Sequence, residues 1–376
     1  MIGFNLPLLT GREQKYLKKV LKNKSLSGDY YFSQKCSLLL EKILKCKKVM
    51  LVPSGTAALE MAAILADIQR SDEVIMPSYT FTSTANAFVL RGAKIVFVDI
   101  RPDTMNIDEN LIEKAITKKT KVIVPVHYGG VGCDMEKIMD LARQYHLFVV
   151  EDAAQAIAAS YKGRYLGTIG EMGCLSFHES KNITCGEGGA ILLNNPKLIE
   201  RAEIIREKGT NRKKFFQGKV DKYTWVDIGA SYLLSELNAA FLLAQLERIA
   251  TVTRDRVRSW NMYHKLLKPL MDKGLIDLPK IPSKCEHNGH IFYIKTKNLK
   301  ERTRLIDYLK KHKISAVFHY IPLHSSPAGK KFGRFSGRDL WTTKESERIL
   351  RLPMHYDMGE NDVKKIVKTI ERFYQK

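Results

Sequence analysis

A single lysine, Lys181, stands between a predicted strand and a glycine-rich turn in the stretch GCLSFHESKNITCGEGGA. The apolar residues Met172–Phe177 predict the strand, and the three glycines within 186–189 predict the turn. Glycines let the backbone close around a ligand, and burial can lower a lysine pKa until its amine becomes a nucleophile. This stretch could present an amine to an aldehyde, with the Ser176 hydroxyl near a phosphate. A lysine beside a turn is more often a solvated surface residue, so the interpretation needs support from the rest of the chain.

Other chemically capable side chains follow the ends of neighbouring predicted strands. Strands and helices alternate from residue 49 to residue 153, which predicts a mostly parallel sheet with helices on its faces. In such sheets, ligands bind beyond the carboxyl ends of the strands. The residues at those ends are therefore candidates for one site: Ser54-Gly55-Thr56, Ser78-Tyr79-Thr80-Phe81, His127-Tyr128, and Glu151-Asp152 with Gln155.

The tripeptide Ser54-Gly55-Thr56 lies where a predicted strand passes into a helix. Free backbone N–H groups and hydroxyls at a helix N-terminus form a suitable phosphate site. Serine and threonine also cap helices routinely, so Ser54 or Thr56 could be only a cap, or could cap and bind together.

Asp152 follows the apolar run FVV at the end of another predicted strand. A carboxylate there needs a cation or strong donors, and a protonated pyridine nitrogen would satisfy it while keeping that ring an electron sink. Gln155, one helical turn further on, could reach a ring hydroxyl, and Phe81 could cover a planar ring. The alternatives are that Asp152 caps a helix over Ala153–Ala156 and that Phe81 belongs to the core.

Five stretches resemble, in order and spacing, the DegT/DnrJ/EryC1/StrS family of pyridoxal-phosphate-dependent nucleotide-sugar aminotransferases: PSGTAALEMA, PSYTFTSTANA, VEDAAQA, SFHESKNITCGEGG and FHYIPLH. The similarity runs the full length of the chain. It implies an α/β protein of fold type I, in which a large domain (residues 1–250, with N-terminal lead-in helices) holds a mostly parallel seven-stranded sheet. A smaller C-terminal α+β domain would comprise residues 251–376. The resemblance also implies pyridoxal 5′-phosphate (PLP) as cofactor and a homodimer with shared active sites.

Carried over residue by residue, the resemblance implies that Lys181 is the catalytic Schiff-base lysine and that Asp152 contacts the pyridine nitrogen. It further implies a set of cofactor-binding residues: Gly55, Thr56 and Ser176 at the phosphate, Gln155 at the ring hydroxyl and Phe81 over the ring. Some members have histidine in place of the lysine and are dehydratases, so Lys181 favours transamination. The candidates to contact the sugar or phosphates are Lys208, His319, Tyr320 and His324, although any one of these histidines could be an ordinary hydrogen-bonding core residue.

Longer stretches, among them REKGTNR, DKYTWVDIG and FHYIPLHSSPAG, resemble the branch of the family that aminates C4 of dTDP-4-keto-6-deoxyglucose. L-glutamate would be the donor and 2-oxoglutarate the released product. The motifs do not fix the configuration at C4, and the whole-chain resemblance favours galacto over gluco. Many members carry GxNxRM with an asparagine that crosses to the partner's phosphate, whereas residues 229–234 read GASYLL here. We therefore assign no residue, Ser231 included, to that cross-subunit contact.

The net charge of +22, from 62 basic and 40 acidic residues, suits a nucleic-acid binder, an anionic membrane surface or an anionic small substrate. The basic residues are dispersed among acidic ones without a nucleic-acid motif, so we expect no nucleic-acid partner. A cofactor-bound regulator without turnover is an alternative from another class. No long apolar run or signal-peptide pattern is present, and we expect a cytoplasmic protein without a membrane span. Six scattered cysteines without a CxxC pair predict reduced thiols and no metal site.

Outside the alternating region, the sequence predicts an amphipathic helix over residues 11–22 and a long helix beginning near residue 232. In the C-terminal part, HIFYIKT and SAVFHYIP predict strands, and RTRLIDYLKKH and GENDVKKIVKTIERFYQ predict helices.

Overall fold

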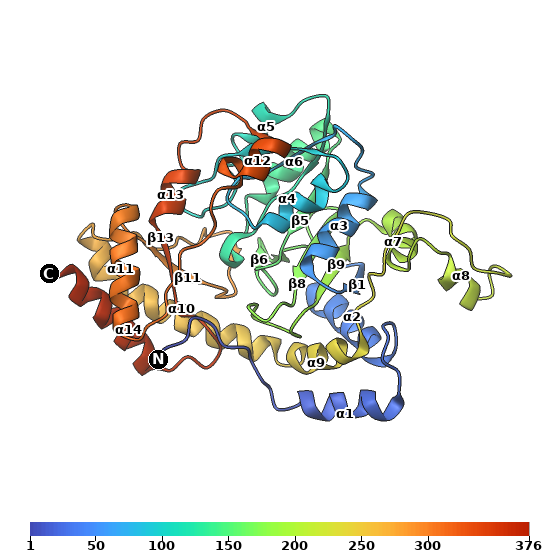
Figure 1. Cartoon of the computed structure of the whole chain (residues 1–376), viewed down its shortest axis with the longest axis horizontal. Helices are drawn as coiled ribbons and strands as arrows, with labels where there is room; N and C mark the ends of the chain where they lie inside the picture. The colour runs from blue at the N-terminus through green and yellow to red at the C-terminus, as the bar shows by residue number, and fades with distance from the viewer. Residues whose placement is uncertain (376) are drawn as a thin grey trace.

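One eight-stranded sheet organises the protein in the computed structural model, which describes residues 1–375 (Figure 1). Its strand order is β1-β9-β8-β5-β4-β2-β3-β12, and β9 runs antiparallel to both of its neighbours while the other pairs are parallel. The strands are β1 (Lys48–Val52), β2 (Glu73–Pro77), β3 (Lys94–Val98), β4 (Thr120–Ile123), β5 (Phe148–Asp152), β8 (Met172–Ser176), β9 (Gly189–Leu193) and β12 (Gly333–Phe335). The predicted α/β class with seven mostly parallel strands is confirmed, and β12 is an eighth strand that the sequence did not predict.

Helices cover both faces of this sheet. One face packs against α3 (Gly55–Leu65), α4 (Thr82–Val89) and α7 (Ile199–Arg206), and the other against α2 (Tyr31–Leu44), α6 (Met135–Tyr145) and α9 (Glu236–Leu246). Successive residues of each strand alternate between two separate cores, as the pleat requires. In β5, for example, Val149 belongs to one core and Val150 to the other.

The C-terminal part has its own core, built from α10 (Ile249–Asp272), α11 (Leu299–Lys311), α14 (Glu360–Tyr374), and the antiparallel pair β11 (Phe292–Lys295) and β13 (Ile349–Leu352). Contacts cross the predicted domain boundary after residue 250 in both directions. Ile2 joins the C-terminal core and pairs with Ile314, while β12 pairs with β3 of the large sheet. The boundary itself stays a prediction. Both chain ends lie on the C-terminal side of the molecule (Figure 1).

Of the two strands predicted in the C-terminal part, one is confirmed and the other is wrong. HIFYIKT contains β11, but SAVFHYIP forms no strand: only Val317 makes a bridge, to Arg351, and the short helix η3 (Leu323–Ser325) follows. Tyr320 has a positive φ of 31°, which interrupts an extended backbone. The partner of β11 is β13 instead, which the sequence analysis did not predict. The long helix begins at Glu236 rather than near residue 232, because Ser235 caps it.

The remaining elements are short or peripheral. They are α1 (Glu13–Asn23), α5 (Ile112–Ala115), α8 (Arg212–Phe216), α12 (Pro327–Phe332), α13 (Thr342–Arg348), β6 (Ser160–Tyr161), β7 (Arg164–Tyr165), β10 (Cys285–Glu286), η1 (Tyr128–Gly130) and η2 (Pro196–Leu198). Within residues 1–375, no helix is long and apolar enough to cross a membrane, and no cluster of three His, Cys, Asp or Glu side chains is placed to hold a metal ion.

Candidate active site

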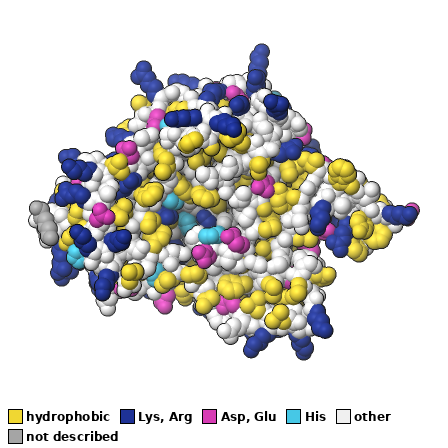
Figure 2. Space-filling model, in the orientation of Figure 1, with side chains coloured by type: hydrophobic (Ala, Val, Ile, Leu, Met, Phe, Trp, Pro, Cys, Tyr) yellow, Lys and Arg dark blue, Asp and Glu magenta, His cyan; other side chains and the backbone are white. Residues whose placement is uncertain are grey.

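A cavity of about 490 Å³ lies at the carboxyl ends of the parallel strands. It brings together all seven residues predicted to hold the cofactor, which are Gly55, Thr56, Phe81, Asp152, Gln155, Ser176 and Lys181. His319 and Tyr320, two of the four predicted substrate contacts, also line it. The face of the molecule in Figure 2 is hollowed near its middle, with histidine and basic side chains inside the hollow. Residues from five separate strand ends therefore meet in one space.

The N-terminus of α3 forms one end of this cavity. Ser54 caps the helix, since its Oγ accepts a hydrogen bond from the Ala57 N–H at 3.0 Å. The N–H groups of Gly55 and Thr56 open the helix and have no acceptor within it, so they are available to an anion. A Cβ on Gly55 would lie 2.9 Å from Ser176 Cβ, so only glycine lets the two strand ends approach this closely. The result is a backbone donor site beside a serine hydroxyl.

Lys181 faces the same cavity from the turn after β8, and its backbone N–H donates to the His178 carbonyl at 2.9 Å. Burial lowers the pKa of the Lys181 amine from its ordinary value to about 8, the charge of Asp152 opposes this shift, and the charge of Arg351 adds to it. The neutral amine is therefore a substantial minority near physiological pH, available as a nucleophile or proton carrier.

Asp152 ends β5 and lies 6% exposed at the cavity wall. Its Oδ2 accepts a hydrogen bond from the Thr84 hydroxyl at 2.7 Å, and its Oδ1 accepts one from the Ala154 N–H at 3.1 Å. Residues 153–156 form turns rather than a helix, so the alternative that Asp152 caps a helix is wrong. The carboxylate retains acceptor capacity towards the cavity.

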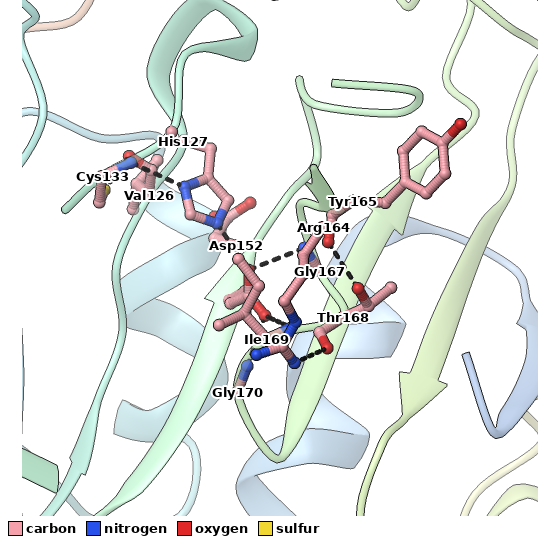
Figure 3. A network of polar contacts seen from close by, with 12 residues as sticks. Val126, His127, Cys133, Asp152, Arg164, Tyr165, Gly167, Thr168, Ile169 and Gly170 are labelled. Carbon is pink, nitrogen blue, oxygen red and sulfur yellow. Dashed lines mark hydrogen bonds and ion pairs between the residues drawn. The ribbon is translucent and has the colours of Figure 1, made fainter. Parts of the chain in front are cut away.

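A second buried network holds the end of β5 in place. Glu151 is fully buried, and its carboxylate accepts hydrogen bonds from the N–H groups of Gly167, Ile169 and Gly170 and from His127 Nε2, at 2.6 to 2.9 Å. His127 Nδ1 accepts from the Cys133 N–H at 3.2 Å, so the proton of a neutral ring lies on Nε2. Figure 3 shows His127 and the 164–170 turn approaching the Asp152 end of β5 from two sides.

Gln155 and Phe81 are both neighbours of Tyr320. The Gln155 amide accepts from the Gly129 N–H at 2.7 Å and donates to the Tyr320 hydroxyl at 2.9 Å. Phe81 is 57% exposed at the cavity mouth, with its ring 6.1 Å from that of Tyr320, so it is not a core residue. An exposed aromatic ring at this position can cover a planar ligand.

Comparison with known proteins identifies the family. The model of the DegT/DnrJ/EryC1/StrS aminotransferase family matches residues 7–371. The chain belongs to this family. It is 36% identical over 341 residues to an uncharacterized protein from Methanocaldococcus jannaschii, covering 89% of this chain and 88% of the other. It is 32% identical to a pleiotropic regulatory protein from Geobacillus stearothermophilus, covering 99% of both chains.

Solved structures agree with this family assignment. An aminotransferase from Psychrobacter cryohalolentis has a TM-score of 0.91 and 26% identity to this chain, covering 98% of both. The recognition of the family from its sequence motifs is thereby confirmed. Aminotransferases of this family depend on PLP, and structural neighbours of this chain are known in forms with PLP and with its amine form. The prediction of PLP as cofactor and of an aminotransferase is therefore confirmed.

The side chains and backbone groups of this cavity fit PLP. The open N–H groups of α3 suit a phosphate, and a carboxylate with spare acceptor capacity and an amine of lowered pKa line the same cavity. The exposed ring of Phe81 lines the same cavity. The chemistry of this donor set matches the phosphate, pyridine nitrogen and aldehyde of PLP.

Two predicted substrate contacts do not reach this cavity. His324 bonds Ser78 Oγ through Nδ1 at 2.7 Å and pairs with Asp339 through Nε2 at 3.2 Å, which fastens η3 to the end of β2. Lys208 is exposed outside the cavity, and its backbone N–H donates to the Ala230 carbonyl at 3.0 Å. Ser231 bridges Glu207 in the same region. None of these three residues lines the cavity.

His319 and Tyr320 enter the cavity on a constrained backbone. The Tyr320 φ of 31° turns its ring inward, and the two rings stack with centroids 3.6 Å apart. His319 Nδ1 lies 2.7 Å from the Tyr128 hydroxyl. Burial, with added effects of Arg351 and Lys181, lowers the His319 pKa well below its ordinary value, so this imidazole is neutral.

Several lining residues escaped the sequence analysis. They are Phe4, Asn5, Thr84, His290 and Arg351, among others. Thr84 had a usable signal, since it lies one helical turn after Phe81 on a helix that starts at the sheet edge. Phe4, Asn5 and Arg351 come from chain segments far from Lys181 in the sequence and outside the alternating pattern, and no local pattern placed them at the site.

Proposed function

We propose that this protein transfers an amino group from L-glutamate to C4 of dTDP-4-keto-6-deoxy-D-glucose, with galacto configuration, giving dTDP-4-amino-4,6-dideoxy-D-galactose. The observation that carries amino transfer is the meeting of Lys181 and Asp152 in one cavity beside the open N-terminus of α3. The choice of sugar rests on the long stretches that resemble dTDP-4-amino-4,6-dideoxygalactose transaminase. Its product would serve surface polysaccharide synthesis such as that of enterobacterial common antigen.

Different residues of the cavity would contact different parts of the cofactor. In this proposal, the N–H groups of Gly55 and Thr56 and the Ser176 hydroxyl bind the phosphate, and Asp152 binds the pyridine nitrogen. Gln155 contacts the ring hydroxyl and Phe81 covers the ring. When bound, PLP supplies an electron sink for the substrate carbon that carries nitrogen.

Lys181 moves the proton in both halves of the proposed reaction. Its Nζ takes a proton from the glutamate α-carbon and, in the second half, delivers one to C4 of the sugar. A pKa of about 8 suits both directions, since neither protonation state of the amine is rare near neutral pH. Thr84 orients the Asp152 carboxylate through its 2.7 Å hydrogen bond, so the acceptor faces the cavity in a fixed direction.

The proposed enzyme is a homodimer with shared active sites. The segment around α8 extends away from the rest of the molecule (Figure 1). It carries exposed apolar side chains, which are Phe215, Phe216, Tyr223, Trp225 and Val226. Exposed aromatic clusters of this kind favour an interface with a second chain. Analytical ultracentrifugation, with dissociation expected on Trp225→Asp and Phe216→Asp together, tests this part of the proposal.

Product analysis tests the reaction itself. The purified holoenzyme is incubated with glutamate and dTDP-4-keto-6-deoxyglucose, and the nucleotide product is analysed by NMR. We expect stoichiometric 2-oxoglutarate and an axial 4-amino group, the galacto configuration. An equatorial amine would assign the gluco product, and amination of a different keto-sugar nucleotide alone would replace the proposed substrate.

The name of the Geobacillus stearothermophilus relative favours a second candidate, a cofactor-bound regulator without turnover. Glutamate added to the holoenzyme separates the two functions. An aminotransferase converts the bound cofactor to its amine form, which shifts its absorbance from the visible range to the near ultraviolet. An unchanged spectrum at saturating glutamate would favour the regulator.

A further inference from the structure

Arg351 is a cation in the cavity whose role the cofactor site does not explain. It lies on β13 of the C-terminal part, opposite Tyr293 of β11 and bridged to Val317. Its guanidinium Cζ lies 4.7 Å from the ring centroid of Phe4, and both residues line the cavity with Lys181. The phosphate site is formed by other elements, at the N-terminus of α3.

The guanidinium has no protein acceptor among the residues that the structure describes. No carboxylate of those residues lies within ion-pair distance of Arg351, and its Nε is buried without a hydrogen-bond partner. Several other described residues also have a buried unpaired polar atom, but Arg351 is the one among them that lines this cavity. An unpaired buried donor destabilises a protein, and a charged one does so more strongly, so an external acceptor at this guanidinium would be favourable.

The charge of Arg351 acts on the reacting groups. It lowers the pKa of Lys181 and contributes to the lowered pKa values of His290 and His319. The acidic side chains that line the cavity are Asp152 and Glu187; Asp152 is bound by Thr84, and Glu187 Oε1 lies 3.6 Å from His178 Nε2. An anion that enters beside Lys181 would therefore meet the positive charge of Arg351 without a competing acid bound to it.

The chemistry of the two substrates decides which anion this is. An amino acid that gives up its nitrogen beside Lys181 brings its carboxylates within a few bonds of that nitrogen. The keto-sugar has no anionic group near C4, since its diphosphate is attached at C1 on the far side of the ring. A guanidinium binds a carboxylate through two parallel hydrogen bonds, which a lysine cannot do.

We infer that Arg351 binds a carboxylate of the amino donor. This inference rests on the proposed function and assigns the residue that selects its donor. The Phe4 ring lies against the guanidinium, with its centroid 4.7 Å from Cζ, so Phe4 is a positioning residue for the same contact.

Ligand binding without turnover gives the first test. Glutarate, which has the carbon skeleton and both carboxylates of glutamate but no amine, is titrated into the holoenzyme by calorimetry, with butyrate as the single-carboxylate comparison. For Arg351→Gln we expect glutarate to bind about 10- to 100-fold more weakly, the range for a lost charge-assisted contact. The matched control, Arg254→Gln on the exposed side of α10, should bind like wild type. Equal glutarate affinity in Arg351→Gln and wild type would overturn the inference.

Half-reactions give the second test and separate the two carboxylates. Single-turnover conversion of the holoenzyme is followed with glutamate, with 4-aminobutyrate, which lacks the α-carboxylate, and with 2-aminobutyrate, which lacks the γ-carboxylate. Arg351→Gln should slow the glutamate reaction, chiefly by raising the glutamate concentration that gives half the maximal rate. With the donor that lacks the carboxylate bound by Arg351, the variant and the wild type should react at similar rates. The melting temperature and the bound-cofactor spectrum confirm that the variant is folded and loaded.

The sugar half-reaction distinguishes this inference from the proposed function. Arg351→Gln enzyme in its amine form should react with the keto-sugar within about threefold of wild type, since the lost contact is to the donor. A large loss in the sugar half-reaction with unchanged glutarate binding would assign Arg351 to the diphosphate and overturn the inference. Failure of wild-type enzyme to aminate the sugar would instead reject the proposed substrate and leave the glutarate result standing.

Discussion

Glu151 and Asp152 are adjacent carboxylates on one strand with opposite environments. Glu151 points to the core that contains Val149, where three backbone N–H groups and His127 saturate it. Asp152 points to the face that contains Val150 and opens on the cavity, with two protein donors. The alternation of a β-strand thus separates a carboxylate that stabilises the fold from one that can bind a ligand. The number of protein donors, rather than burial, distinguishes the two roles.

The largest effect should come from the amine that faces Asp152. For Lys181→Ala we expect a loss of at least about 10³-fold in amino transfer, because the variant lacks the group that moves the proton. Noncovalent binding of PLP should largely persist. Stopped-flow absorbance with glutamate measures the loss, and Lys265→Ala on exposed α10 is the control. Activity near the wild-type level would reject the role of Lys181.

Asp152→Asn tests the open carboxylate. We expect a drop of about 10²–10³-fold in the glutamate half-reaction, because a neutral amide no longer holds a protonated pyridine nitrogen. The free energy of unfolding should change little, since the amide oxygen can accept from the Ala154 N–H while the amide NH₂ donates to the Thr84 hydroxyl, which can also be an acceptor. Half-reaction rates and urea denaturation of the same preparation measure the two quantities, and a large stability loss with intact chemistry would contradict the comparison.

Glu151→Gln tests the carboxylate whose acceptors are all used by protein donors. We expect this variant to lose stability and to keep most of its activity. The amide NH₂ of the variant would face backbone N–H donors, and we expect the free energy of unfolding to fall by about 2–4 kcal/mol. The activity of the folded fraction should remain within about tenfold, because the side chain at this position does not line the cavity. Urea denaturation and half-reaction rates are measured for this variant and for Asp152→Asn. Equal changes in stability and in activity for the two variants would refute the assignment of a structural role to Glu151 and a ligand-binding role to Asp152.

The pH dependence of PLP capture tests the electrostatic coupling between Asp152 and Lys181. The neutral form of Lys181 grows as pH rises through its pKa of about 8, so capture of PLP by cofactor-free protein should accelerate between about pH 7 and pH 9. The Asp152 charge raises the Lys181 pKa, and its removal in Asp152→Asn should move the midpoint to lower pH. Rates of PLP capture across this range measure both midpoints, and a shift to higher pH would contradict the assigned coupling.

The smallest effect should come from the ring cover. For Phe81→Ala we expect PLP to bind up to about tenfold more weakly, the range for one aromatic contact, with stability unchanged because the side chain is largely exposed. Fluorescence titration of cofactor-free protein measures this affinity. An unaltered affinity would place Phe81 outside the cofactor contacts.

The half of the site on the large sheet could be predicted from sequence, and the other half could not. Strand-end residues such as Asp152 and Ser176 follow from alternation and the geometry of parallel strands, which are local signals. Arg351 and His290 reach the cavity through packing of the C-terminal part, which no local pattern encodes. Tyr320 was predicted only as part of a motif. Its positive φ interrupts the extended backbone, which is why the strand predicted over SAVFHYIP does not form. The three-residue β12 is too short to show alternation.

The short strand β12 has a consequence for synthesis of the chain. It covers the outer edge of β3, whose N–H and C=O groups would otherwise be open to pairing with another chain. Residues 333–335 leave the ribosome more than 230 residues after β3, so the growing chain carries an unprotected sheet edge for most of translation. A chain that ends before residue 333 lacks the strand that covers this edge, which leaves β3 open to pairing with another chain.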